Sequence, residues 1–128
     1  MTAVLRVLIV DDEDDLRETM VKRLKARKII AEGANSGPQA LKILEDKSFD
    51  VIVLDVKMPE MDGIETLRRI KDMKPEIEVI VLTGHASVEF GTKGMQLGAF
   101  DFMMKPAPLS ELLDTIEQAY NKKRTMDR

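Results

Sequence analysis

The sequence of 128 residues contains no cysteine and no tryptophan, and only 4% of its residues are aromatic. The absence of cysteine excludes disulfides and thiolate metal sites, and it favours a reducing cytoplasm as the location. The shortage of aromatics argues against a surface on which nucleic-acid bases stack, and a net charge of −3 gives no general attraction to nucleic acid or membrane. No apolar run approaches the roughly 20 residues that a membrane-spanning helix needs, and the first residues lack the features of a signal peptide. We therefore expect a cytoplasmic protein that contacts neither nucleic acid nor membrane directly.

Five short segments rich in β-branched and apolar residues predict strands. They are residues 4–10, 28–34, 50–55, 78–83 and 99–104. The central ones are apolar throughout instead of alternating, which is typical of parallel strands covered on both faces.

The segments between these strands have the spacing of helices. Leu16, Met20 and Leu24 recur every fourth residue, as on one face of a helix. Ser36 with Pro38 and Gln39 predicts one helix start, Asp62 with Glu65 predicts another, and Pro75 predicts a helix end.

Regular alternation of strand and helix predicts an α/β fold with a doubly wound parallel sheet. We expect the flavodoxin-like arrangement: five strands in the order 2-1-3-4-5 and five helices, in three layers. One domain should span residues 1–121, with 122–128 as a tail or the start of a linker.

Polar residues stand at the carboxyl ends of the predicted strands, which meet at one edge of the sheet. Asp11 and Asp12 follow the first strand, Asp55 ends the third, Thr83 ends the fourth and Lys105 follows the fifth. Open parallel sheets bind ligands at the carboxyl ends of their strands, where the strand order reverses, and here that point lies between the first and third strands. The three acids therefore stand where a site is expected.

Three carboxylates crowded together require compensation. Two unit charges about 5 Å apart repel by roughly 3 kcal/mol at an effective dielectric constant of about 20. A hard divalent cation with oxygen ligands would relieve this repulsion, and so would the ammonium of Lys105. A cation and a lysine also form a clamp for a phosphoryl group, which an aspartate carboxylate can accept covalently.

Four motifs in this order carry a family resemblance. They are "DD" after the first strand, "LDVKMPEMDG" around the third, "LTGHA" after the fourth and "GAFDFMMKP" at the fifth. Over residues 4–121 the chain resembles a CheY-like receiver domain of bacterial two-component response regulators. This family implies a phosphorylation-dependent signalling switch that catalyses only its own phosphorylation and dephosphorylation, and is not otherwise an enzyme.

The resemblance assigns a phosphoacceptor and a metal site. Asp55 would accept the phosphoryl group from a histidine kinase or a phosphotransfer protein. Asp11, Asp12, Asp55 and the backbone carbonyl of Lys57 would hold Mg²⁺, with Mn²⁺ as an alternative.

Further roles follow from the same resemblance. Lys105 would pair with the phosphoryl oxygens, and Thr83 would bind one of them as part of a switch with the aromatic Phe102. The bond between Lys105 and Pro106 would be a cis peptide. The switch would reshape the face formed by residues 87–120, which would regulate an output domain or partner protein and could form a homodimer on phosphorylation.

The sequence also suggests a rim to the site and a weak helix. Gly84 would keep the entrance uncrowded, and His85 and Lys57 would flank the phosphate and tune the access of water. Gly91 and Gly94 lie inside the fourth predicted helix, at a cost of about 1 kcal/mol each relative to alanine, which favours a role for this helix in conformational change.

The same residues also allow other interpretations. Asp11 and Asp12 could simply cap a helix, and Lys105 could be an exposed turn residue. A phosphatase of the haloacid-dehalogenase type would need a second aspartate where Lys57 stands, and also a cap domain. A flavin- or nicotinamide-binding domain would need a glycine-rich phosphate loop where "DDEDD" stands.

Overall fold

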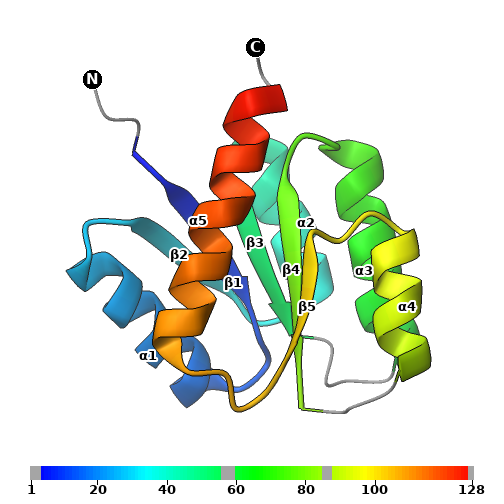
Figure 1. Cartoon of the computed structure of the whole chain (residues 1–128), viewed down its shortest axis with the longest axis horizontal. Helices are drawn as coiled ribbons and strands as arrows, with labels where there is room; N and C mark the ends of the chain where they lie inside the picture. The colour runs from blue at the N-terminus through cyan, green and yellow to red at the C-terminus, as the bar shows by residue number, and fades with distance from the viewer. Residues whose placement is uncertain (1–3, 56–59, 85–87, 127–128) are drawn as a thin grey trace.

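The computed structural model describes residues 4–55, 60–84 and 88–126, without the side chains of 60–62, 88–90 and 126. Strands and helices alternate along the chain (Figure 1). Their bounds are β1 (Arg6–Val10), α1 (Asp14–Ala26), β2 (Ile30–Ala34), α2 (Gly37–Asp46), β3 (Val51–Asp55), α3 (Glu60–Met73), β4 (Glu78–Thr83), α4 (Val88–Gln96), β5 (Asp101–Met104) and α5 (Leu109–Met126). None of the described helices combines the length and the apolar character needed to cross a membrane.

The five strands form one sheet in the order β2-β1-β3-β4-β5, and each neighbouring pair is parallel. This confirms the flavodoxin-like fold and strand order that the sequence predicts. All six residues of β4 are buried, as are four of the five in each of β1 and β3, whereas the edge strands β2 and β5 are partly exposed. The apolar central strands are therefore those covered on both faces.

Alternate side chains of the sheet enter two separate cores. On one face, Ile52, Leu54 and Val81 pack with residues of α2 and α3; on the other, Val53 and Ile80 pack with residues of α1 and α5. Figure 1 shows α1 and α5 in front of the sheet, with α2 and α3 behind it. The result is the expected three-layer structure.

Some predicted bounds differ from those observed. Strand β2 begins at Ile30 and not at Lys28, because Lys28 and Ile29 complete the end of α1. The predicted helix start at Asp62 is wrong, because α3 already includes Glu60, and Glu65 forms ion pairs with arginines further along the same helix. The start at Ser36 is confirmed, since its side chain accepts a hydrogen bond from the backbone N–H of Gln39 at 3.2 Å.

The C-terminal helix extends beyond the domain end predicted at residue 121. It continues to Met126, so residues 122–126 of the expected tail are helical. Lys122 lies 3.6 Å from the buried Glu78, and Lys123 lies 3.2 Å from Asp50. These pairs hold the last turns of α5 against the amino end of the sheet; the domain boundary itself stays a prediction.

Helix α1 ends in a Schellman motif that has a lysine where glycine is usual. The N–H of Lys28 donates to Lys25 O at 2.9 Å, and the N–H of Ile29 donates to Leu24 O at 3.2 Å. Lys28 has φ of 65°, a left-handed conformation that its Cβ disfavours. Helix α4 ends with the same two bonds, but Gly98 takes the left-handed position there.

We expect Lys28→Gly to raise the free energy of unfolding by about 0.5–1 kcal/mol, because glycine adopts this conformation without the steric cost. Urea unfolding would measure the change. Lys25→Gly is the matched control, since the same replacement inside α1 should lower stability by about 1 kcal/mol. An equal loss of stability in both variants would contradict this account of the helix end.

Candidate functional site

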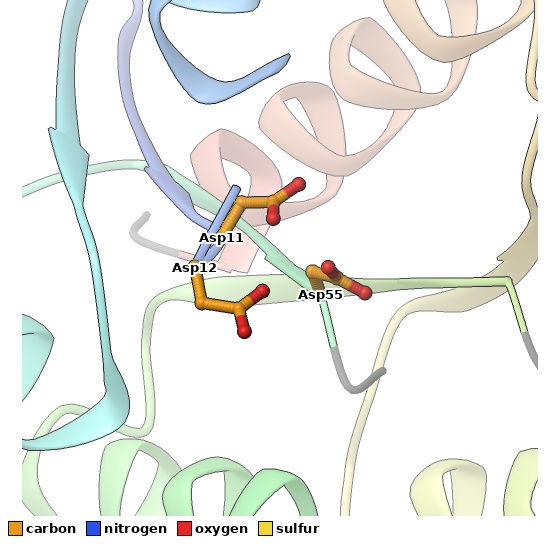
Figure 2. A group of neighbouring side chains, drawn as sticks. All are labelled: Asp11, Asp12 and Asp55. Carbon is orange, nitrogen blue, oxygen red and sulfur yellow. The ribbon is translucent and has the colours of Figure 1, made fainter. Parts of the chain in front are cut away.

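Three carboxylates meet at the carboxyl ends of β1 and β3. The register pairs Val10 with Leu54, so the next residues, Asp11 and Asp55, lie side by side, and Asp12 follows on the loop. One carboxylate oxygen from each of the three lies within 4.8 Å of the others. Figure 2 shows the three side chains gathered at these two strand ends. The sheet thus brings together the acids that the sequence placed at this edge.

Lys105, which directly follows β5, binds two of the acids. Its Nζ donates to Asp11 Oδ2 at 3.1 Å and to Asp55 Oδ2 at 3.0 Å. The side chains of Asp11 and Asp55 are only 4% and 3% exposed, and that of Lys105 is 15% exposed. Lys105 is therefore not an exposed turn residue. Its ammonium is largely buried and binds two of the carboxylates.

Asp11 is held through every polar group that it has. Its N–H donates to Ala34 O on β2 at 3.0 Å, and its carbonyl accepts from Arg17 at 2.9 Å. Its Oδ1 accepts from the N–H of Glu13 at 2.9 Å, while its Oδ2 accepts from Lys105. Glu13 is the N-cap residue of α1, so the bond from its N–H to Asp11 closes a turn ahead of the helix and does not cap the N–H groups of the first helical turn. The Asp11 side chain belongs to the acid cluster instead.

Burial and crowding shift the protonation of this cluster. Burial raises the pKa of Asp55 to about 6, and neighbouring Asp11 adds to the rise while Lys105 opposes it. Burial alone would lower the pKa of Lys105, but its bonds to Asp55 and Asp11 outweigh burial, so that pKa lies above its ordinary value. The site therefore holds its negative charge at a cost that one lysine does not fully offset.

Thr83 ends β4, and Lys105 directly follows the neighbouring strand β5, next to this cluster. Thr83 is fully buried at the end of β4, and its carbonyl accepts from the N–H of Lys105 at 2.7 Å. The peptide bond between Lys105 and Pro106 is cis.

Phe102 lies one strand further from the acids, opposite Val81 of β4, and is partly buried against the core on the α2–α3 side of the sheet. Its ring faces α4, where a Cβ built on Gly91 would lie 3.3 Å from two ring carbons. A Cβ on Gly94 would make only ordinary contacts. Gly91 thus permits a close approach between the ring and the helix, whereas Gly94 has no such role.

Of the three residues expected at the rim of the site, the structure describes only Gly84. Lys57 and His85 lie outside the described residues. Gly84 is exposed, and a side chain built there would have no atom within 4 Å.

Two features of the site were not predicted from the sequence. A pocket of about 530 Å³ opens from the acids toward α2 and α3, and its lining includes Asn35, Ser36 and Thr66. Arg17 on α1 binds the carbonyl of Asp11. The sequence signal for Arg17 was its place in "DDEDDLR", one helical turn after Asp14, but a helix-surface ion pair would give the same signal.

The cluster suits a hard divalent cation. All of its side-chain donors are carboxylate oxygens, which are the ligands that Mg²⁺ and Mn²⁺ prefer. Asp12 is exposed, so the cluster is open to solvent on one side. Burial is the main cause of the raised pKa of Asp55, and a dication would offset the repulsion from Asp11 that adds to it.

Comparison with known proteins identifies the family. The family described as response regulator receiver domain matches residues 7–117. The regulatory protein AtoC of Escherichia coli is 38% identical over 93% of this chain and 26% of its own length. A CheY-like receiver from Methanospirillum hungatei superposes with a TM-score of 0.91 at 27% identity, covering 97% of this chain and 99% of the other. The beryllofluoride-activated receiver dimer of NtrC4 gives 0.85 at 36% identity, covering 92% and 98%.

The chain belongs to the receiver domains of two-component response regulators, as the motifs indicated. Members of this family are signalling switches, and phosphorylation and Mg²⁺ binding are general features of it. The chain spans about a quarter of the length of the curated relatives that it matches.

In metal-free buffer we expect Asp55→Asn to be more stable than the wild type above pH 6, by about 1–3 kcal/mol. The folded-state pKa of Asp55, about 6, lies above its ordinary value of 3.8. The wild type therefore loses stability as the pH rises through this interval. Toward about pH 3, below both pKa values, the carboxyl is mostly protonated in both states and the two proteins should converge. Urea unfolding between about pH 3 and 8 would measure the difference.

Asp114→Asn is the matched control, because Asp114 is exposed on α5. Its difference from the wild type should stay small and vary little over this range. If the difference in stability between Asp55→Asn and the wild type stayed constant from about pH 3 to 8, the pKa of Asp55 would not be raised by folding.

Proposed function

We propose that this chain is a phosphorylation switch in which Asp55 takes a phosphoryl group from a histidine kinase or a phosphotransfer protein. The observation that carries the proposal is the buried carboxylate of Asp55, fixed at a strand end beside two further acids and bonded to Lys105. Transfer of a phosphoryl group depends mainly on positioning and on neutralising charge, and this arrangement supplies both.

In the transfer step, a carboxylate oxygen of Asp55 attacks the phosphorus of the phosphohistidine. A P–O bond forms as the P–N bond breaks, and the electron pair of the broken bond stays with the imidazole. The ammonium of Lys105, already 3.0 Å from Asp55, can turn to the phosphoryl oxygens as their charge approaches. Thr83, buried one residue beyond the β3–β4 register, would donate its hydroxyl to another of these oxygens.

Asp11, Asp12, Asp55 and the backbone carbonyl of Lys57 would hold Mg²⁺, or Mn²⁺ in its place. The ion supplies positive charge that offsets both the acids and the incoming phosphoryl group. Asp11 orients its carboxylate through the bonds that fix its own backbone.

A haloacid-dehalogenase type of phosphatase remains the weaker interpretation. It would need an acid two residues after the nucleophile, and Lys57 stands there. We expect the chain to catalyse only its own phosphorylation and dephosphorylation, and to act in the cytoplasm.

The output would be a changed surface on α4, β5 and α5. The curated relatives are regulatory and transcriptional proteins about four times as long as this chain, which favours an output domain or a partner protein as the target. An activated receiver of similar fold is a dimer in solution, which favours homodimerisation on phosphorylation as one form of this output.

The link from Asp55 to this surface would run through Thr83 and Phe102. A phosphoryl group draws the Thr83 hydroxyl inward, and the ring of Phe102 moves into the vacated space. Because that ring lies against Gly91, its movement releases or shifts α4.

Phosphorylation is tested by incubating the chain with Mg²⁺ and acetyl phosphate and then measuring the intact mass in mildly acidic solution. We expect a gain of one phosphoryl group in the wild type and in Asp114→Asn, loss of the adduct after mild base, and no gain in Asp55→Asn or without a divalent cation. An adduct of equal yield in Asp55→Asn would overturn the assignment of the acceptor.

The switch is tested by hydrogen exchange with and without Mg²⁺ and beryllofluoride, a phosphoryl mimic. We expect the mimic to change exchange in α4 more than in α1. Gly94→Ala should slow exchange in α4 about fivefold without the mimic, since it adds about 1 kcal/mol of helix stability without touching Phe102. Protection of α4 equal to that of α1 under both conditions would exclude α4 as the moving element.

A further inference from the structure

Arg17 makes contacts that a surface arginine does not need. One guanidinium nitrogen donates to the carbonyl of Asp11 at 2.9 Å, and another donates to Asp14 Oδ1 at 2.8 Å. The Asp14 side chain is 75% exposed, so this ion pair is a weak surface contact, but the side chain of Arg17 is only 15% exposed. Arg17 is therefore a largely buried arginine whose guanidinium binds the loop that carries the acids.

The carbonyl that Arg17 binds belongs to the peptide that joins Asp11 to Asp12. Fixing this carbonyl fixes the plane of the peptide, and with it the direction in which the chain leaves Asp11 and presents Asp12. The N–H of Asp11 is already held by Ala34 of β2, so Arg17 supplies the second point that stops the loop from rotating. The relative placement of two carboxylates of the cluster thus depends on a residue that lies outside it.

Gly33 gives Arg17 the room to reach this carbonyl. Gly33 lies on β2 opposite Ile9, and a Cβ built on it would come within 2.9 Å of Arg17 Cδ and 3.0 Å of Cγ. The stem of Arg17 therefore crosses directly over the glycine. A side chain at position 33 would have to push the arginine aside, which is cheap for the fold because the arginine stem is flexible.

We propose that Arg17 is a positioning residue of the cation site, and that Gly33 is needed because it leaves the path of Arg17 open. The inference rests on the proposed function in that Asp11, Asp12 and Asp55 bind Mg²⁺. Arg17 touches neither the cation nor the phosphoryl group; it acts through the peptide between Asp11 and Asp12. This role distinguishes it from an arginine that merely stabilises α1 through Asp14.

Simple electrostatics predicts the opposite effect of removing Arg17. A positive charge near the acids repels a dication, so loss of that charge alone would tighten Mg²⁺ binding. A positioning role predicts weaker binding, because outer-shell partners of metal ligands typically contribute about 10- to 100-fold to affinity. The sign of the change therefore separates the two accounts.

The test is the Mg²⁺ dissociation constant, measured by isothermal titration calorimetry on the whole chain at pH 7.5 and roughly physiological salt, which screens surface charges beyond about 8 Å. We expect Arg17→Ala to weaken binding about tenfold or more, within the range given for outer-shell partners. Arg17→Lys keeps a donor on a long stem and should recover part of this loss. Asp14→Ala is the matched control, and it should bind Mg²⁺ within about twofold of the wild type because it removes only a weak exposed pair.

Gly33→Ala tests independently whether the stem of Arg17 must cross over position 33. It should weaken Mg²⁺ binding when Arg17 is present and have no further effect in the double variant with Arg17→Ala. Circular dichroism of each variant would verify that the fold is intact, and Gly33→Ala supplies the answer should Arg17→Ala not fold.

The possible results separate the two claims. Unchanged or tighter binding in folded Arg17→Ala, or a loss as large in Asp14→Ala, would overturn the positioning role while leaving the proposed function in place. An equal effect of Gly33→Ala with and without Arg17 would overturn the part assigned to Gly33. Failure of the wild type to bind Mg²⁺ at all would instead remove the cation site on which both claims depend.

Discussion

The mutual repulsion of three carboxylates at the ends of two adjacent buried strands is the constraint on which this structure depends. The β1–β3 register places Asp11 beside Asp55, with Asp12 next along the chain, and burial keeps water from screening the first two. A pair of unit charges at about 5 Å contributes roughly 3 kcal/mol of repulsion at an effective dielectric constant of about 20, a large share of a small domain's stability of about 5–15 kcal/mol. Lys105 relieves part of this repulsion, and the remainder favours a dication or a proton.

Two parts of the fold surround the acids: the β1 side fixes their positions, and the β4–β5 side connects them to α4. On the β1 side, Asp11 is bonded through its N–H, its carbonyl and both carboxylate oxygens, so little freedom remains. On the β4–β5 side, buried Thr83 lies two residues beyond Val81, which pairs with Phe102, and the ring of Phe102 lies close to Gly91 of α4. This division supports the switch proposed above, in which added charge at the firmly held acids would move only the side that carries Phe102 and α4.

Most of the fold could be predicted from the sequence because its signals are local. Continuous apolar runs mark β1, β3 and β4 as buried parallel strands, and alternation with helices then specifies the sheet and the edge where the acids meet. The bounds were harder to predict. Lys28 looks like the start of a strand but completes α1 in a left-handed conformation, and the basic residues near the C-terminus continue α5 because Glu78 and Asp50 lie across from them.

The candidate site could be predicted residue by residue only where a residue stands at a strand end. Asp11, Asp12, Asp55, Thr83 and Lys105 all do. The roles of Arg17 and Gly33 could not be predicted because the two residues are far apart in the sequence. They come together only when β2 pairs with β1, so that the stem of Arg17 crosses over Gly33. The pocket toward α2 and α3 was missed for the same reason, since its walls come from four separate stretches of the chain.

The central claim is that a proton and a dication compete for the same crowded carboxylates. Isothermal titration calorimetry of Mg²⁺ binding in buffers of different ionisation enthalpy measures the protons released on binding. Because the pKa of Asp55 is raised to about 6, binding at pH 6 should release about half a proton, and binding at pH 8 almost none. The same small release at both pH values, or no binding of Mg²⁺, would contradict the account.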